Sequence, residues 1–158
     1  MEIRIDGWKS NLTFSSAHFL PDYSQCSHLH GHTYAVHAIV EGDIEKGIVI
    51  DFRIIKKIIK EIIKEIDHRV IIPIEGMLDI RKNEQVEVEY NGKKYSFPKE
   101  DCVFLPIYSS SAENIASYIL KKVVDALNVD AIKKENIKTI RIGVDEGYGQ
   151  GAWTEWRR

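Results

Sequence analysis

The pattern of apolar and polar residues predicts an extended strand at the start of the chain. Residues 2–18 alternate, and Leu12, Phe14, Ser16 and His18 fall on one face of that strand. This assignment follows because successive side chains of a strand point to opposite faces. A loop rich in turn-forming residues comes next.

A second strand is predicted over residues 29–41. One of its faces begins with His30 and His32 and continues with apolar residues, whereas His37 has the opposite phase. Two strands joined by one loop favour an antiparallel pair. His18 at the end of the first strand would then meet His30 and His32 at the start of the second.

Two amphipathic helices are predicted from apolar residues that recur every three or four positions. The first follows Asp51, a good N-cap residue, and should end near Asp67, His68 and Arg69. The second should span about 112–127. The apolar stripe of the first helix consists of isoleucine alone, at Ile54, Ile55, Ile58, Ile59, Ile62, Ile63 and Ile66. Packing into the core explains both stripes.

The remaining elements are a hairpin and two C-terminal strands. Alternating residues flank Asn91 and Gly92, a dipeptide that favours a tight two-residue turn, so a hairpin is expected near residues 83–98. Strands over 138–146 and 153–156 complete the order β-β-α-(hairpin)-α-β-β. Strands that pair with one another, with the helices gathered on one face, give an α+β fold rather than a doubly wound parallel sheet.

Composition narrows the classes of function. With 158 residues, of which 44% are hydrophobic and 29% charged, the chain suits a single soluble domain over residues 1–158. A net charge of −2 does not suggest a nucleic-acid partner, and no apolar run approaches the ~20 residues of a membrane helix. Cys26 and Cys102 are the only cysteines, and the N-terminus does not resemble a signal peptide. We therefore expect a cytoplasmic protein.

The candidate chemistry centres on the loop between the first two strands. Four of the six histidines lie between positions 18 and 32. Three imidazoles at one end of a sheet are uncommon as ordinary sheet residues, and neutral imidazole is a good zinc ligand. One possibility is a structural zinc site with Cys26 as fourth ligand. The other is a catalytic site with His18, His30, His32 and an open position, where a nearby thiol would ionise more easily and act as base or nucleophile.

Further candidates come from later in the chain. Asp67 and His68 are either a polar helix end or a carboxylate that orients a proton-exchanging imidazole. Glu146 is either a strand end that reaches solvent or a buried carboxylate that needs partners. A flat heterocycle with two adjacent N–H donors, such as a pterin edge, would supply those partners. Cys102 is interpreted as a core thiol and His28 as a solvated side chain.

Six short motifs, in order along residues 12–156, resemble a known family, and the set is far more specific than any one motif. They are Phe14-Ser15-Ser16-Ala17-His18, Cys26-x3-His30-Gly31-His32, Gly47-Ile48-Val49-Ile50-Asp51-Phe52, Asp67-His68-Arg69, Ser111-Ala112-Glu113-Asn114 and a final strand that reaches a Glu. The chain resembles the 6-pyruvoyltetrahydropterin synthases and 6-carboxytetrahydropterin synthases.

The resemblance implies the tunnelling fold, in which each subunit has a four-stranded antiparallel sheet with two helices on one face. Three subunits would close their sheets into a barrel, and two trimers would stack into a homohexamer with active sites between subunits. Relative to compact family members, the hairpin near 83–98 looks like an insertion that covers the site, alters the oligomer or has no chemical role.

The resemblance also assigns roles to individual residues. His18, His30 and His32 would bind Zn²⁺, Cys26 would be the catalytic cysteine with the pair Asp67 and His68, and Glu146 would anchor the pterin. The family usually has Glu-Thr in the last motif, whereas this chain has Asp145-Glu146-Gly147. The anchor could therefore be Asp145, but Glu146 shares the phase of the apolar residues before it.

The implied substrate is 7,8-dihydroneopterin triphosphate. Zinc would polarise its side-chain oxygens and acidify the neighbouring C–H bonds, and triphosphate would be eliminated. One family branch makes 6-pyruvoyltetrahydropterin. The other cleaves the side chain to give 6-carboxy-5,6,7,8-tetrahydropterin for deazapurine (queuosine-type) synthesis. The three residues between Cys26 and His30 resemble the second branch. Other hypotheses are an aldolase-like cleavage of dihydroneopterin and a non-catalytic zinc- or pterin-binding oligomer.

Overall fold

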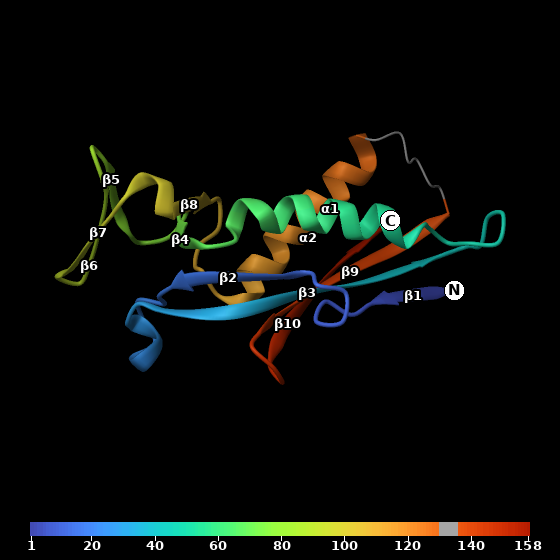
Figure 1. Ribbon diagram of the computed structural model, residues 1–158, viewed down its shortest axis with the longest axis horizontal. Helices are drawn as coiled ribbons and strands as arrows, with labels where there is room; N and C mark the ends of the chain where they lie inside the picture. Colours follow the sequence, from blue (N-terminus) through green and yellow to red (C-terminus); the bar gives the residue numbers. More distant parts are fainter. Residues whose placement is uncertain (130–135) are drawn as a thin grey trace.

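The computed structural model describes residues 1–129 and 136–158, and it contains a large sheet with α-helices packed on one face (Figure 1). The strands of this sheet are β1 (Glu2–Ile5), β2 (Thr13–His18), β3 (His30–Gly42), β4 (Arg69–Pro73), β8 (Cys102–Leu105), β9 (Ile137–Glu146) and β10 (Gly151–Arg157). The helices are α1 (Phe52–Ile66) and α2 (Ala112–Val129). The expected α+β class is confirmed.

The main sheet is wider than the four antiparallel strands that were expected. Strands β2, β3, β9 and β10 do form that antiparallel group, but within the described ranges the sheet has seven strands in the order β10-β9-β3-β2-β4-β8, with β1 also paired to β3. Strands β4 and β8 are parallel additions beside β2. Both are short apolar runs without alternation, and such runs do not reveal by periodicity whether they form strands.

The expected first strand over residues 2–18 is broken into β1 and β2. A turn separates the two, closed by hydrogen bonds from Ser10 N to Asp6 O (3.0 Å) and from Leu12 N to Gly7 O (2.9 Å). At Gly7 a Cβ atom would lie 2.4 Å from the carbonyl oxygen of Val36. The close approach of this turn to β3 therefore requires glycine.

The two helices cover the face of the sheet that carries the histidines. Asp51 caps α1 by accepting a hydrogen bond from Arg53 N, as predicted, and Asp67 is its C-cap. The isoleucines on the inner side of α1 are buried, and Ile54 and Ile58 lie at the margin of the core. These side chains pack against apolar residues of β2, β3 and β9, among them Phe14, Tyr34, Val36, Ala38, Ile140, Ile142 and Val144.

A second, smaller sheet contains the predicted hairpin. Its strands are β5 (Asp79–Lys82), β6 (Val86–Tyr90) and β7 (Lys93–Phe97), of which β5 was not predicted. Asn91 and Gly92 both have positive φ (45° and 79°), as a two-residue hairpin turn requires. Two short 3-10 helices lie next to this sheet. The first, η1 (Ser24–Ser27), is close to it in space, and the second, η2 (Lys99–Asp101), follows β7 in the chain. Among the described residues, no helix is long and apolar enough to cross a membrane.

Replacing Ile59 by alanine should destabilise the fold more than the same change at Ile58. Ile59 is fully buried, so truncation leaves a cavity and should lower the free energy of unfolding by roughly 2–5 kcal/mol. Ile58 lies at the core margin and is the matched control. Urea unfolding of both variants measures the difference. Equal losses would contradict the assigned orientation of α1.

Candidate active site

Three histidines converge on the helix-covered face of the sheet, as their phases predicted. In the antiparallel pairing of β2 with β3, His18 is directly opposite His30, and Ser16 is opposite His32. Residues opposite each other or two positions apart on one face bring their side chains into contact range. The ligand nitrogens of His18, His30 and His32 all lie within 4.8 Å of one another.

Backbone carbonyls fix the orientation of two of the three rings. The Nδ1 atom of His18 lies 2.8 Å from the carbonyl oxygen of Ser110, and the Nδ1 atom of His30 lies 2.7 Å from that of His28. A carbonyl oxygen only accepts hydrogen bonds, so each Nδ1 carries the proton. In the neutral rings both Nε2 atoms then have free lone pairs, and these two atoms face each other at 3.1 Å. Such an arrangement is suited to a cation between or beside the nitrogens.

The cluster fits a divalent metal ion with nitrogen ligands. Two nitrogens on one tetrahedral zinc ion, with bonds of about 2.0–2.1 Å, are roughly 3.3 Å apart, close to the 3.1 Å between the rings of His18 and His30. Burial lowers the pKa of His18 below its ordinary value, against the opposing effects of the Ser110 carbonyl and Glu146, and so favours the neutral, metal-binding form. Among the described residues, Cys26 is not part of this ligand group. The donor set therefore resembles a site with an open position.

Glu146, at the end of β9, faces the histidine cluster. It is opposite Tyr34 in the pairing of β3 with β9. Its Oε1 atom lies 3.3 Å from Nε2 of His18 and 3.8 Å from Nε2 of His32. The hydroxyl of Tyr34 donates to the same oxygen at 3.3 Å. Burial and the negative charge of Glu146 raise the pKa of Tyr34 well above its usual range, so the tyrosine remains a donor. The predicted inward phase of Glu146 is confirmed.

Asp145, the other candidate in this motif, points to the opposite face. Its Oδ2 atom accepts hydrogen bonds from Nε1 of Trp8 (2.9 Å) and from Nε2 of His37 (3.0 Å). The backbone N–H of Gly7 donates to Nδ1 of His37, which leaves the proton on Nε2. These contacts tie the turn after β1 to β3 and β9. The carboxylate of Asp145 is therefore occupied away from the cluster.

Asp67 and His68 form the predicted carboxylate–imidazole pair at the end of α1, with 2.9 Å between Oδ1 and Nδ1. Two backbone contacts fix the pair on β2: Ser15 N donates to Asp67 Oδ1 (2.8 Å), and His68 N donates to Ser15 O (2.7 Å). Partial burial raises the pKa of Asp67, but the hydrogen bonds from Ser15 and His68 outweigh it and hold the carboxyl below its ordinary value. His68 has a positive φ of 58°, an uncommon conformation for a residue with a side chain. The ring itself is exposed.

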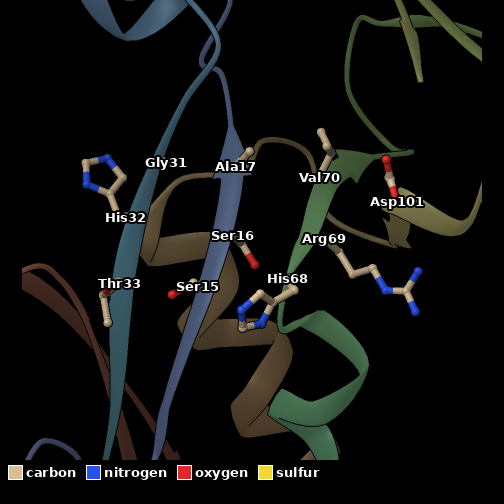
Figure 2. A pocket seen from close by; sticks show the side chains of 10 residues that line it. All are labelled: Ser15, Ser16, Ala17, Gly31, His32, Thr33, His68, Arg69, Val70 and Asp101. Carbon is tan, nitrogen blue, oxygen red and sulfur yellow. The ribbon is translucent and has the colours of Figure 1, made fainter. Parts of the chain in front are cut away.

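The Asp67–His68 pair and the histidine cluster are separated within one chain. His68 and His32 both line a cavity of about 610 Å³ beside β2 and β3. Figure 2 shows the ring of His32 on the far side of β3 and the ring of His68 beyond β2, near Arg69. Cys26 lies in η1 and is exposed. The structure thus brings His18, His30, His32 and Glu146 together and does not bring the thiol or the Asp67–His68 pair into contact with them.

A further carboxylate, Glu113 at the start of α2, was not singled out from the sequence. Glu113 lines a cavity of about 510 Å³ together with Ser109, Ser111 and Asn114 at the start of α2. The intervening Ser110 is the residue whose carbonyl orients His18. Glu113 is the acidic residue in the first turn of α2, a position that the helix dipole favours. Its place in the motif Ser111-Ala112-Glu113-Asn114 was the sequence feature that could have marked it as a candidate.

Comparisons with known proteins identify the family of the chain. Residues 8–157 match the family model described as 6-pyruvoyl tetrahydropterin synthase, and the chain belongs to this family. A Methanocaldococcus jannaschii protein named "Putative 6-carboxy-5,6,7,8-tetrahydropterin synthase" is 37% identical over 156 residues, which are 96% of this chain and 94% of that protein. The 6-carboxy-5,6,7,8-tetrahydropterin synthase of Aquifex aeolicus is 32% identical over 124 residues, 75% of this chain and 74% of that protein. The crystal structure of the Plasmodium vivax 6-pyruvoyl tetrahydropterin synthase superposes with a TM-score of 0.91 at 31% identity, covering 100% of this chain and 98% of that one.

Replacing His30 by alanine should abolish stoichiometric metal binding, because it removes one of three converging nitrogens. His28→Ala is the matched control, since His28 is exposed in the same loop and orients His30 only through its backbone carbonyl. Metal content after purification, measured by inductively coupled plasma mass spectrometry, should fall only in the first variant. Loss of metal in both variants, or in neither, would contradict the ligand assignment.

The metal-free protein should lose stability as the pH falls below about 6.5. The folded state holds His18 neutral to lower pH than the unfolded chain, so the unfolded state binds more protons in this range. Linkage then lowers the free energy of unfolding by up to about 1.4 kcal/mol per pH unit for this one group. Chemical denaturation between pH 5 and 8 (roughly the histidine range) gives the slope. A His18→Asn variant should have a smaller slope, and an unchanged slope would refute the assignment.

Proposed function

We propose that this protein is a zinc-dependent lyase that converts 7,8-dihydroneopterin triphosphate into 6-carboxy-5,6,7,8-tetrahydropterin and releases triphosphate together with the other two carbons of the side chain. The observation that carries the proposal is the convergence of His18, His30 and His32, with Glu146 against them, in a chain of the tetrahydropterin synthase family. An enzyme of this family acts on pterins. The names of the relatives at 37% and 32% identity favour the 6-carboxy product.

The metal site supports activation of the substrate side chain. Zinc held by three neutral imidazoles would keep a position for substrate oxygen, polarise it and acidify the neighbouring C–H bonds. His18 is oriented by the Ser110 carbonyl and His30 by the His28 carbonyl, which keeps their Nε2 atoms available. Water access is limited on the side of His18, which is fully buried.

Proton transfer is assigned to Cys26 together with Asp67 and His68. The Nδ1–H of His68 donates to Asp67, which leaves Nε2 on the exposed side of the ring free to accept a proton. The low pKa of Asp67 keeps this carboxylate charged and able to stabilise a protonated His68. Cys26 would take the carbon-bound proton as a thiolate.

A homohexamer with active sites between subunits would complete the site. Within one chain, the exposed His68 ring lies across β2 and β3 from the ring of His32. A groove between two chains would allow the pair of one subunit to meet the metal site of another. The separation of the candidate catalytic groups therefore supports a shared site.

Glu146 is proposed to bind the pterin or its side chain. A carboxylate accepts two parallel N–H bonds from one heterocycle edge. Glu146 points to the histidine cluster. The carboxylate of Asp145, in contrast, already accepts hydrogen bonds from Trp8 and His37. This difference favours Glu146 over Asp145 as the anchor.

The second candidate product is 6-pyruvoyltetrahydropterin, from the same substrate. The superposition on the Plasmodium vivax enzyme named for that activity favours this alternative. The three-residue spacing between Cys26 and His30 and the names of the relatives favour the first product. An aldolase-like cleavage would use the same metal site with a third product. A non-catalytic zinc- or pterin-binding oligomer would release no product.

The decisive experiment is mass spectrometry of the products from the zinc-loaded protein and dihydroneopterin triphosphate. We expect triphosphate and 6-carboxytetrahydropterin from the wild-type protein. Cys26→Ala should retain zinc and lose about 10²- to 10⁴-fold in turnover, the usual contribution of a proton-transfer group. Cys102→Ala is the control, because that half-buried thiol has no assigned role.

Two results would overturn the proposal. Absence of both triphosphate and any pterin product would leave a binding protein rather than a lyase. Loss of zinc from Cys26→Ala would make the cysteine a ligand and the metal site structural.

A further inference from the structure

The loop that carries Cys26 is exposed and is held by hydrogen bonds within itself. None of the residues of η1 is buried, and Ser24 has a positive φ of 31°. Within the loop, Leu20 N donates to Cys26 O at 2.7 Å and Ser27 N donates to Tyr23 O at 3.1 Å. These bonds close the loop on itself, but exposed backbone hydrogen bonds without packing open readily. Contacts from outside the loop would therefore help to fix the position of the thiol.

The turn between β6 and β7 supplies contacts on both sides of Cys26. The hydroxyl of Tyr90 donates to the carboxylate of Asp22, which precedes the thiol. The ammonium group of Lys93 donates to the carbonyl and to the hydroxyl of Ser27, the residue after the thiol, each at 3.3 Å. The hydrogen bond to Asp22 raises the pKa of Tyr90, which keeps the phenol in its donor form.

The small sheet is itself anchored in the protein interior. Val86 and Val88 are buried and pack with Phe19 and Ile72 in a cluster separate from the main core. The ring of Tyr95 stacks on Phe19 with 4.9 Å between centroids. Phe19 directly follows the candidate metal ligand His18 in the sequence. Figure 1 places the small sheet and the loop at the same end of the molecule, beyond the ends of β2 and β3.

The contact between sheet and loop is polar and local. A cavity of about 190 Å³ lies between them, lined by Phe19, Pro21, Ser27, Tyr90, Asn91, Lys93 and Tyr95. Continuous apolar packing therefore does not hold the loop here. The hydrogen bonds of Tyr90 and Lys93 carry the connection.

We propose that Tyr90 and Lys93 are positioning residues, and that the sheet β5-β6-β7 holds the Cys26 loop in place relative to the histidine cluster. The inference rests on the proposed role of Cys26 in proton transfer. Proton transfer depends steeply on the placement of the donor and acceptor atoms. A sheet that is anchored next to His18 can hold the loop at a fixed position relative to this candidate metal ligand.

The test compares the double variant Tyr90→Phe/Lys93→Met with Lys94→Met in the zinc-loaded, full-length protein. Lys94 is the matched control because it belongs to the same strand and pairs with Glu89, 3.4 Å away within the small sheet. The double variant should lose between about 10- and 100-fold in kcat, as a displaced catalytic group does. Its KM for dihydroneopterin triphosphate, its zinc content and its thermal midpoint should match those of the control. Lys93→Arg alone should retain most of the activity, because a guanidinium also donates to a carbonyl and a hydroxyl.

Hydrogen exchange gives a readout that does not depend on turnover. Peptides that cover residues 20–28 should exchange faster in the double variant than in Lys94→Met, because the backbone bonds of Leu20 and Ser27 lose their outside support. Unchanged exchange in this loop would overturn the proposal. A higher KM with unchanged kcat would also overturn it, since Lys93 would then bind the substrate. The wild-type protein could lack turnover while the loop still exchanges faster in the double variant. In that case the proposed reaction is wrong, and the positioning of the loop by Tyr90 and Lys93 is supported.

Discussion

Two imidazole nitrogens that face each other, Nε2 of His18 and Nε2 of His30, set the main constraint on this structure. Backbone carbonyls hold the Nδ1 protons of His18 and His30, so the opposed Nε2 atoms, 3.1 Å apart, would repel each other in the absence of a cation. The arrangement persists because the pairing of β2 with β3 and the core beneath it hold both strands in register. A metal ion bound by these nitrogens would relieve this repulsion, and it would be connected to the start of α2 because the Ser110 carbonyl orients His18.

The rest of the candidate site follows from the position of β3 at the centre of the sheet. Its pairing with β2 supplies the histidines, and its pairing with β9 brings Glu146 opposite Tyr34 on the same face. The end of α1 adds Asp67 and His68, which are fixed to β2 through Ser15. The thiol is different, because Cys26 lies in an exposed turn whose supports come from a separate small sheet. The three histidines and the thiol are therefore positioned by different parts of the fold.

Much of this arrangement could be predicted from local sequence. Alternation along two strands was enough to place His18, His30 and His32 on one face and His37 on the other, and the isoleucine stripe located α1. The break at Gly7 could not be predicted, because it depends on the carbonyl of Val36, far along the chain. Strands β4 and β8 were missed, since short apolar runs carry no period. The separation of His68 from the metal ligands, and the contact of Tyr90 and Lys93 with the Cys26 loop, depend on tertiary packing that no local pattern encodes.

The identity of the metal's ligands decides between a catalyst and a structural centre, and hence the role of Cys26. Zinc-edge X-ray absorption spectroscopy on the purified zinc-loaded protein reports those ligands directly. The account predicts imidazole nitrogens and a further light atom at about 2.0–2.1 Å, with no sulfur in the first shell. A sulfur scatterer at about 2.3 Å would place the thiol on the metal and contradict the account.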